Sequence, residues 1–437
     1  MDNLCPLKEV QKRFCIIDMH GEFMLFDKEQ IEEAKSGNYT GDISFYKKSH
    51  AELNMRRYLE TLPINSKPKE VIASFWNNPT TKVYKQTAFT PNTTKPDTLN
   101  YWVPHTIKPF QNDFKIIERY LLKVICDDNE SSYAYLIKFL AHMLQSPGEK
   151  PGVVPVLIGG QGTGKGVFFQ LIKAIWSKTT LLVSDVNEVV GQFNAGLERN
   201  YIVCMDEALF AGDKRSLDRL KSIVTESTIR IEQKYQPSRT IESVHRFFAA
   251  TNHKHFAHID NDDRRFFFLR VSSERQQDTK YFKDLCDSFR DGTTLEGFVD
   301  FLTDLNLAKF NVRERPKTSE HKNQKLKSLQ KFDRYWYEVL VNGCLALDEF
   351  QPEIWESERF IGTSKLKIYF KNFDKNAEKF EAILMSEISQ AVGRLCPSAA
   401  SSRRQINSNQ SRGFELPSLE TARKEFENVL NIAIDWY

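Results

Sequence analysis

Apolar and polar positions change their spacing along the chain, and each change predicts a different kind of element. Between residues 1 and 105, short strand-like runs occur at Phe14–Met19, Glu22–Phe26 and Lys82–Phe89, and one helix is expected near Ala51–Leu62. No residue pattern in this part points to a chemical role. We therefore expect an N-terminal region of mixed α/β structure over residues 1–105.

A helical period begins near residue 112 and predicts two amphipathic helices between residues 106 and 148. Pro147 and Gly148 end the second of them. The apolar positions of the two helices are Phe114, Ile117, Leu121 and Val124, followed by Tyr133, Leu136, Ile137, Leu140 and Leu144. A helical bundle of this kind can serve as a lid, as an assembly surface or as simple packing, and the pattern does not rank these roles.

The next segment has the pattern of a strand, a glycine-rich loop and a helix. Apolar residues run from Val153 to Ile158, the loop covers Gly159–Gly166, and apolar residues then recur at helical spacing. The loop fits the Gly-x-x-x-x-Gly-Lys core of a phosphate-binding loop, with Lys165 as its lysine. The residues expected to contact a nucleotide are Gly159, Gly160, Gln161, Gly162, Thr163, Gly164, Lys165 and Gly166.

A loop of this type is suited to ATP and Mg²⁺. Glycines let backbone N–H groups converge on a polyphosphate, and the following helix adds the partial positive charge of its N-terminus. Lys165 is expected to bridge the β- and γ-phosphates. Gly166 departs from the motif, because a Ser or Thr at this position usually supplies a hydroxyl to Mg²⁺. An ordinary glycine-rich turn is the alternative for the motif taken alone.

Two further strands end in polar residues that suit nucleotide hydrolysis. The run Asn200–Glu207 ends in Asp206, a candidate Mg²⁺ ligand, and Glu207, a candidate base for the attacking water. An Asp-Glu ending is common at ordinary strand edges, and its place after a phosphate-binding loop favours the catalytic role. The run Arg246–Asn252 ends in Asn252, which can reach the γ-phosphate or the water, because open α/β sheets bind ligands at strand carboxyl ends.

A basic hairpin follows from alternating residues at 229–234 and 240–244. Its tip carries Lys234, Tyr235 and Arg239, which is a set of cations and an aromatic ring suited to DNA phosphates and bases. The alternative is a solvated hairpin end where charges gather for solubility.

Two arginines, Arg264 and Arg265, precede a strongly apolar strand that reaches Val271. A planar guanidinium there can act as an arginine finger on γ-phosphate charge, and an ordinary charged strand entry is the alternative. The candidate catalytic residues are thus Lys165, Glu207, Asn252, Arg264 and Arg265.

The composition becomes basic and polar beyond Leu307, which predicts a domain boundary near residue 315. Residues 316–437 are expected to be mainly helical, with helices marked by Phe380–Leu395 and Leu419–Leu430. Between these helices, Ser398–Gly413 is predicted to be a mobile polar loop that carries arginines. A winged-helix-like module is one architecture that two helices around a basic loop would suit.

Composition limits the class of protein without identifying a ligand. The hydrophobic fraction of 41% supports folded cores, and the seven scattered cysteines do not approach a Cys-x-x-Cys spacing, so neither a disulfide framework nor a zinc ribbon is expected. No targeting segment or membrane-length apolar run occurs, so we expect a cytoplasmic protein without a membrane partner. With a net charge of +3, any DNA contact must be local.

The order of phosphate-binding loop, Asp-Glu strand, basic hairpin, Asn-ended strand and arginine pair resembles superfamily 3 helicases. The helicase portions of phage, plasmid and poxvirus primase-helicases are the most similar. The resemblance runs at motif level from Trp102 to Val271, and the segment FNAGLERNYIVCMDEALFAG at Phe193–Gly212 is especially similar. More weakly, RGFELPSL at Arg412–Leu419 resembles the segment after the ATPase.

This resemblance implies an AAA+-type P-loop NTPase core with a central parallel sheet over residues 149–315. It also implies a hexameric ring that moves 3′ to 5′ on single-stranded or forked DNA, in the host cytoplasm if the protein is viral. A primase or primase-polymerase is an expected partner, in the same chain or complex. The implied roles are Walker A lysine for Lys165, Walker B pair for Asp206 and Glu207, sensor for Asn252, pore hairpin for Lys234 and Tyr235, and finger on the neighbouring subunit for Arg264 or Arg265.

Two other functions fit parts of the sequence. A P-loop kinase-like enzyme would need neither the basic hairpin nor an arginine acting between subunits. A DNA-binding replication scaffold with a weak ATPase would explain Gly166. Against a decayed site stands the joint retention of Lys165, Asp206, Glu207, Asn252 and Arg264.

Overall fold

The chain divides into two units, one formed by residues 1–256 and 264–318 and the other by residues 257–263 and 319–437. The boundary at residue 318 lies close to the one predicted from composition. The structure is a computed structural model, and it describes all residues except 1–4, 20, 37–43, 64–66, 93, 209–212, 235–237, 261–262, 330, 348–351, 374–383, 407–408 and 437.

Unit 1 begins with a small α/β region, as predicted. Its four-stranded sheet has the order β3-β2-β1-β4, in which β1 pairs antiparallel with β2 and parallel with β4. The strands are β1 (Phe14–Met19), β2 (Glu22–Asp27), β3 (Phe45–Lys47) and β4 (Val83–Tyr84), and a parallel pair follows, β5 (Gln86–Ala88) and β6 (Thr98–Asn100). The helices are α1 (Pro6–Arg13), α2 (Glu29–Lys35), α3 (Lys48–Thr61) and α4 (Pro68–Asn77).

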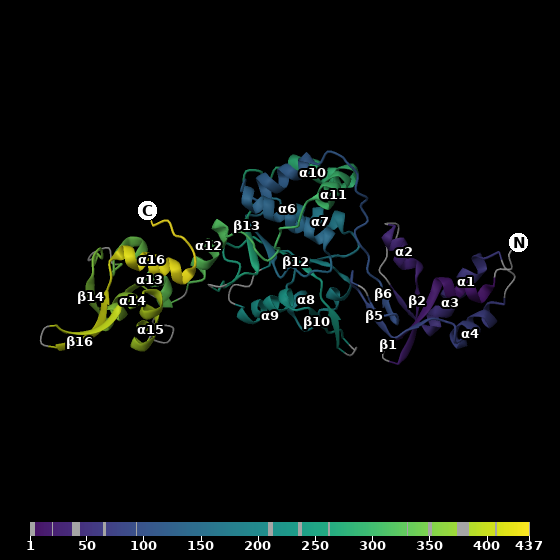
Figure 1. The fold of residues 1–437 in the computed structure, drawn as a ribbon, viewed down its shortest axis with the longest axis horizontal. Coiled ribbons are helices and arrows are strands. Elements are labelled where there is room, and N and C mark those ends of the chain that lie inside the picture. Colours follow the sequence, from purple (N-terminus) through teal and green to yellow (C-terminus); the bar gives the residue numbers. More distant parts are fainter. Residues whose placement is uncertain are drawn as a thin grey trace. The chain divides into compact units, whose positions relative to one another are not determined.

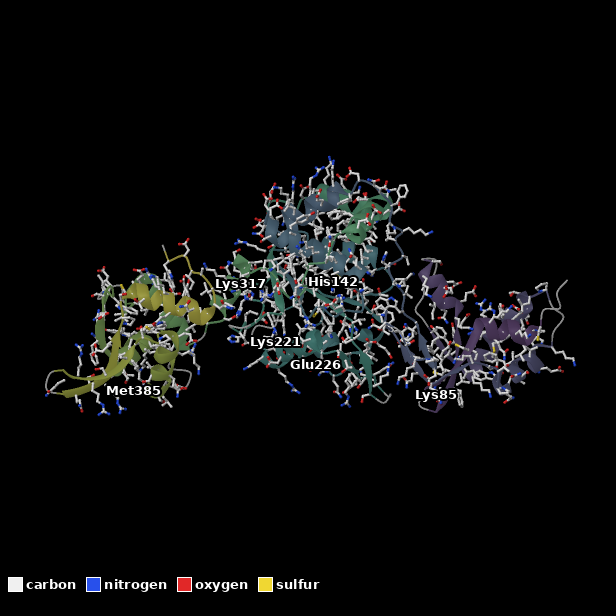
Figure 2. The ribbon with its side chains drawn as sticks, viewed as in Figure 1. Lys85, His142, Lys221, Glu226, Lys317 and Met385 are labelled. Carbon is white, nitrogen blue, oxygen red and sulfur yellow. The ribbon has the colours of Figure 1, made fainter. Side chains whose placement is uncertain are left out.

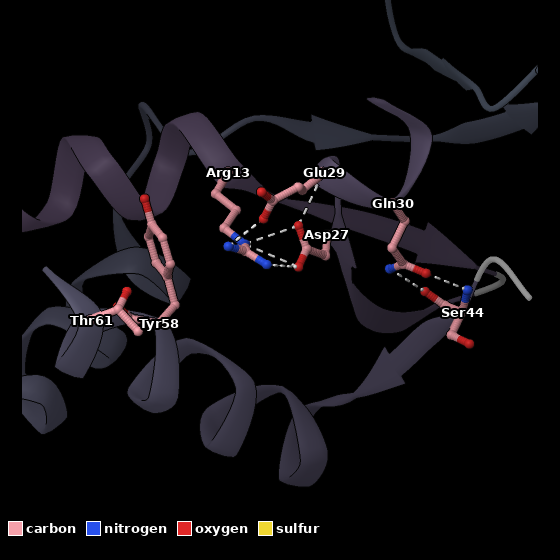
Figure 3. A network of polar contacts seen from close by, with 7 residues as sticks. All are labelled: Arg13, Asp27, Glu29, Gln30, Ser44, Tyr58 and Thr61. Carbon is pink, nitrogen blue, oxygen red and sulfur yellow. Dashed lines mark hydrogen bonds and ion pairs between the residues drawn. The ribbon is translucent and has the colours of Figure 1, made fainter. Parts of the chain in front are cut away.

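Arg13 ties the end of α1 to the end of β2 (Figure 3). Its guanidinium donates to both carboxylate oxygens of Asp27, at 2.9 to 3.2 Å, and also pairs with Glu29. The same guanidinium lies 4.7 Å from the centre of the Tyr58 ring on α3. One side chain of α1 therefore contacts three other elements of the N-terminal region, which gives it a structural role.

The central sheet of unit 1 contains five parallel strands in the order β13-β7-β12-β9-β8, which confirms the expected parallel sheet. All residues of β7 are buried, as is typical of a parallel strand covered on both faces. Later strands lie on both sides of β7, so the strand order reverses there. The strands are β7 (Val154–Ile158), β8 (Thr180–Val183), β9 (Ile202–Met205), β12 (Arg246–Thr251) and β13 (Phe266–Arg270).

Helices cover both faces of this sheet, with α6, α7, α10 and α11 on one side and α8 and α9 on the other (Figure 1). They are α5 (Lys115–Arg119), α6 (Glu130–Gln145), α7 (Lys165–Ile175), α8 (Asn187–Val190), α9 (Lys214–Thr225), α10 (Thr279–Arg290) and α11 (Thr293–Asp304). Short 3₁₀ and π turns lie at Ala195–Arg199 and Tyr120–Ile125. The predicted helices at 106–148 are present, but they share one hydrophobic core with the sheet and do not form a separate bundle.

Unit 2 corrects the prediction for the C-terminal part. Residues 398–413 are largely a β-hairpin, because β15 (Ala400–Ile406) and β16 (Asn409–Leu416) pair antiparallel and β14 (Arg359–Gly362) joins them in the order β14-β16-β15. Phe414 and Leu416 on β16 are buried in the core of the unit, which anchors an otherwise polar hairpin. The helices are α12 (Ser319–Lys327), α13 (Lys331–Asn342), α14 (Thr363–Phe373), α15 (Met385–Leu395) and α16 (Leu419–Leu430).

The prediction of a mainly helical unit therefore left out a three-stranded sheet, which accompanies the helices. The helix expected over Leu419–Leu430 is present with those bounds. The helix expected over Phe380–Leu395 begins at Met385, and Phe380 lies outside the described residues. The winged-helix-like alternative stays a prediction, and the order of α14, α15 and hairpin is compatible with it.

Candidate nucleotide site and hairpin

The glycine-rich loop leaves the carboxyl end of β7, next to the point where the strand order reverses. Ligands of open α/β sheets bind at this kind of position. Gly162 and Gly164 have φ angles of +74° and +100°, which residues with a side chain rarely adopt. Within the described part of the chain, the backbone N–H groups of Gly160, Gln161, Gly162 and Gly164 donate to no backbone acceptor. The loop therefore presents free donors, as a polyphosphate requires.

Lys165 begins α7 and folds back over the loop. Its ammonium donates to the carbonyl oxygens of Gly159 and Gly160 at 2.8 and 2.7 Å, and to Oδ1 of Asn252 at 2.7 Å. Burial lowers the pKa of the Lys165 ammonium, and the negative charges of Asp206 and Glu207 partly offset this effect. The structure thus brings together four residues that the sequence had placed on three separate segments.

Strand order explains why these residues meet. β12 lies between β7 and β9, so Asn252 follows the strand that separates the loop from the Asp206–Glu207 pair. The three strand ends are hydrogen-bonded, since Gly159 N–H donates to the Thr251 carbonyl at 3.3 Å and Ala208 N–H to the Ala250 carbonyl at 2.8 Å.

The Asp206–Glu207 pair has an unusual backbone. Glu207 has a φ angle of +52°, and its N–H donates to the Asp206 carboxylate at 3.0 Å. Left-handed backbone at a non-glycine residue is sparsely populated and gathers at functional sites. Both side chains are exposed at the end of the otherwise buried β9, so their carboxylates are available to a ligand.

The donor set fits an Mg²⁺ ion held together with a nucleotide. Mg²⁺ is usually bound by one or two carboxylates plus phosphate oxygens and water, so Asp206 can serve without a hydroxyl from residue 166. The hydroxyl of Thr163 is already engaged, since it donates to the Gly160 carbonyl at 2.9 Å. In the described residues there is no cluster of three or more His, Cys, Asp or Glu side chains that could hold a metal alone.

Sequence reasoning missed the residues that support the loop from outside. Gln276 donates through its side-chain amide to the Gln161 carbonyl at 2.8 Å, and Gln277 through its N–H to the Gly162 carbonyl at 2.9 Å. Tyr120 donates its hydroxyl to the Gly164 carbonyl at 2.9 Å, from the π turn after α5. A tyrosine on the buried face of a helix usually needs a hydrogen-bond partner for its hydroxyl. The place of Tyr120 on such a face was the one sequence signal for this contact.

Gly166→Ser is expected to be tolerated, and Gly164→Ala to damage the site. A Cβ at residue 166 would meet nothing within 4 Å, whereas at residue 164 it would lie 2.6 Å from the Phe282 ring in a left-handed backbone. Left-handed backbone costs an alanine about 1–2 kcal/mol before any clash. Titration with ATP and Mg²⁺, together with melting temperatures, measures both variants. Loss of nucleotide binding in Gly166→Ser would show that the loop needs glycine there.

The predicted basic hairpin is present as β10 (Thr228–Ile231) and β11 (Arg239–Glu242), which pair antiparallel. Lys234 is exposed at its end, with its ammonium 5.5 Å from the centre of the Phe193 ring. Arg239 is mostly buried in a two-point ion pair with Glu198, so its guanidinium anchors the hairpin. Tyr235 lies outside the described residues.

Residues 193–199, just before β9, are hydrogen-bonded to the hairpin and to the residue that precedes β12. The sequence did not reveal these contacts. Asn194 is buried, donates to the Arg230 carbonyl at 3.0 Å and accepts from Glu232 N–H at 2.9 Å. His245 donates through Nε2 to the Leu197 carbonyl at 2.7 Å, and burial lowers its pKa to about 4, so the ring is neutral near pH 7. The hairpin is thus joined to β9 through this segment and to β12 through the chain itself.

Arg264 and Arg265 lie at the amino ends of the parallel strands, whereas the loop lies at their carboxyl ends. They precede β13, whose first residue pairs with Val154 at the amino end of β7. The five residues of β13 span roughly 16 Å at the usual strand rise, which is longer than an extended arginine side chain. Arg264 is exposed and Arg265 is half-buried. Neither can reach the phosphate-binding loop of its own chain in this arrangement.

Comparisons with known proteins find similarity to a phage primase-polymerase. Residues 157–265 match a family described as a family of unknown function, DUF5906. Over 216 residues the chain is 26% identical to the DNA primase-polymerase of Nitratiruptor phage NrS-1, which is 48% of this chain and 29% of that protein. The chain is therefore homologous to a phage primase-polymerase and covers less than a third of its length.

Solved structures extend the likeness to nearly the whole chain. The A-form apo structure of the NrS-1 C-terminal region has a TM-score of 0.67 at 18% identity and covers 95% of this chain and 100% of that one. A second apo structure of the same region has a TM-score of 0.66 at 17% identity and covers 94% and 99%. These values establish a shared fold. No helix in the described part of the chain is both long and apolar enough to span a membrane.

Proposed function

We propose that this chain is an ATP-driven motor of DNA replication, with an AAA+-type P-loop core that hydrolyses ATP and moves along single-stranded DNA. The observation that carries the proposal is the meeting of Lys165, Asn252, Asp206 and Glu207 at one edge of the parallel sheet. The homology to a phage primase-polymerase supports a place in replication. The ring form and the 3′ to 5′ direction rest on the resemblance to superfamily 3 helicases.

Each residue of the site has a role that its position supports. The loop N–H groups and Lys165 bind the phosphates, and the ammonium exchanges its carbonyl partners for phosphate oxygens. Asp206 would hold Mg²⁺, and the bound ion would neutralise negative charge on the phosphates. Glu207 orients the attacking water and takes its proton, and Asn252 contacts the γ-phosphate or that water. ATP hydrolysis then needs one further cation opposite the loop.

Arg264 supplies that cation from a neighbouring copy. Because Arg264 lies at the amino ends of the strands, it cannot contact the phosphate-binding loop of its own chain. Its side chain is exposed, so it is available to another subunit. A guanidinium stabilises the charge that spreads over the transferred phosphoryl group. We therefore propose a homo-oligomer in which each site is completed by the next subunit, with a hexamer as the form that the resemblance implies.

The hairpin couples hydrolysis to DNA. Two connections lead from the hairpin to the nucleotide site. The chain runs from β11 through β12 to Asn252. Residues 193–199, which are hydrogen-bonded to the hairpin, lead into β9 and Asp206. A change at the γ-phosphate can thus move the hairpin through two strands. Lys234 then contacts DNA phosphates, and Tyr235 stacks on a sugar or base. A primase-polymerase, in the same chain or complex, is the proposed functional partner.

Replacing both Lys234 and Tyr235 with alanine is expected to separate ATP turnover from DNA. Salt-sensitive phosphate contacts and an aromatic stack of roughly 1–3 kcal/mol per base would be lost, while the nucleotide site stays intact. The expected protein is folded and oligomeric, with basal ATPase but without DNA stimulation or unwinding. Turnover and fork unwinding are measured together across a salt series. Normal unwinding by the double variant would remove the hairpin from the mechanism.

A further inference from the structure

Two arginines face each other on the β15–β16 hairpin of unit 2. Arg403 pairs directly with Arg412 in the antiparallel register, and both side chains are exposed. Directly opposite residues have Cβ atoms about 4.5–5.5 Å apart, and like charges at such a position destabilise a hairpin. Among the described residues, neither guanidinium has an acidic partner. The fold therefore keeps an unfavourable pair of positive charges on a projecting strand pair.

The neighbouring arginine behaves differently. Arg404 points to the other face of the hairpin, donates to both carboxylate oxygens of Glu415 at 2.7 Å, and lies 5.3 Å from the centre of the Phe360 ring. Its charge is thus balanced within unit 2. The uncompensated charge is confined to the face that carries Arg403 and Arg412.

The helix that precedes the hairpin has an exposed side of small and uncharged residues. The buried side of α15 packs into the core of unit 2 through Ile388, Ala391, Val392 and Leu395. Its remaining positions include Ser386, Ser389, Gln390 and Gly393, and the space beside Gly393 is open to 4 Å. Met385, at the start of α15, is also exposed (Figure 2).

The charged residues of α15 are already engaged. Glu387 accepts from Leu384 N–H at 2.9 Å, and Arg394 donates to both carboxylate oxygens of Asp333 at 2.7 and 2.8 Å. Only residues 396–399 separate the end of α15 from the start of β15. A helix side of uncharged hydrogen-bonding residues is therefore followed, after four residues, by a strand pair that carries two cations without an acidic partner.

We propose that α15 and the β15–β16 hairpin bind duplex DNA, with α15 in the major groove and Arg403 and Arg412 on backbone phosphates. The major groove admits an α-helix, and Ser and Gln side chains can read base edges there. Arginine contacts to phosphate fix the position of the helix without reading sequence. The negative backbone also removes the repulsion between the two arginines.

Duplex DNA suits this surface better than a single strand does. Proteins that bind single strands stack the bases on aromatic side chains. Residues 401–405 and 410–413 of the hairpin contain no aromatic residue. This surface is distinct from the β10–β11 hairpin of unit 1, and duplex binding here does not require ATP hydrolysis.

The test uses the full chain without nucleotide and a blunt-ended DNA duplex, titrated over a salt series. Arg412→Glu should form a cross-strand ion pair with Arg403, so the melting temperature should not fall while duplex affinity does. The loss of two phosphate contacts should make the negative slope of log affinity against log salt less steep by about 2. Gln390→Glu should weaken duplex binding through repulsion in the groove, with an unchanged melting temperature.

Arg404→Ala is the matched control on the other face of the hairpin. It should lower the melting temperature, because its ion pair with Glu415 is lost, and leave duplex affinity within about twofold, since it makes no phosphate contact. The proposal is overturned if Arg412→Glu binds the duplex like wild type. It is also overturned if Arg404→Ala weakens binding as much as Arg412→Glu, or if single-stranded DNA competes better than duplex at this surface.

Discussion

Glu207→Gln is expected to bind ATP and hold it without hydrolysis, with turnover reduced by roughly 10²- to 10⁴-fold, the usual effect of removing a general base. Gln keeps the shape of the side chain and its left-handed backbone position after β9, but it cannot accept a proton from water. Single-turnover hydrolysis and nucleotide binding are measured on the same preparation. Hydrolysis at the wild-type rate would make the assignment of Glu207 wrong.

Two controls give this result its meaning. Lys165→Ala removes the ammonium that lies over the loop, so it should lose ATP binding itself and differ in kind from Glu207→Gln. Glu33→Gln makes the same chemical change at an exposed position on α2 and should leave turnover unchanged. A loss of binding in both site variants would point to a damaged fold, which melting curves would reveal.

Mixing Arg264→Ala subunits with Lys165→Ala subunits is expected to restore ATP hydrolysis. Each variant alone should be inactive, since an arginine finger contributes roughly 10³- to 10⁵-fold to the rate. In a mixed oligomer, some sites combine an intact Lys165 from one subunit with an intact Arg264 from the next. With equal amounts and random assembly, about a quarter of sites are complete, and turnover should recover to about that share.

The same mixing experiment distinguishes the two arginines. Arg264 is exposed and Arg265 is half-buried, so Arg264→Ala should show the larger loss and the rescue, and Arg265→Ala mainly a change in stability. Native mass spectrometry verifies that mixed oligomers form. No recovery of turnover in verified mixed oligomers would mean that Arg264 acts within its own subunit or not at all.

The local parts of the site could be predicted because each depends on a short run of sequence. An apolar strand followed by glycines and Lys165 identifies the loop, and an apolar strand followed by Asp206 and Glu207 identifies the second polar end. Their proximity depends on strand order, which the sequence does not determine. Lys165 and Asn252 are 87 residues apart and touch only because β12 lies beside β7.

Other features could not be predicted because their cause is tertiary. Gln276 and Gln277 support the loop from a polar segment that resembles any other loop. The sequence predicts a mobile polar loop over residues 398–413, because this stretch is rich in Ser, Arg, Gln and Asn, whereas the structure has most of the β15–β16 hairpin there. Its strand structure comes from pairing with β14 and from burial of Phe414 and Leu416. Local polarity was therefore a poor guide where distant residues provide the packing.

The most direct measurement of the central claim is ATP turnover by the full chain with and without single-stranded DNA, alongside its native mass. If the site drives a motor, turnover should rise on addition of single-stranded DNA, and the active species should be an oligomer. The Lys165–Asn252 site and the β10–β11 hairpin would then act together. A monomer that hydrolyses ATP at the same rate with and without DNA would contradict the account and favour a kinase-like enzyme.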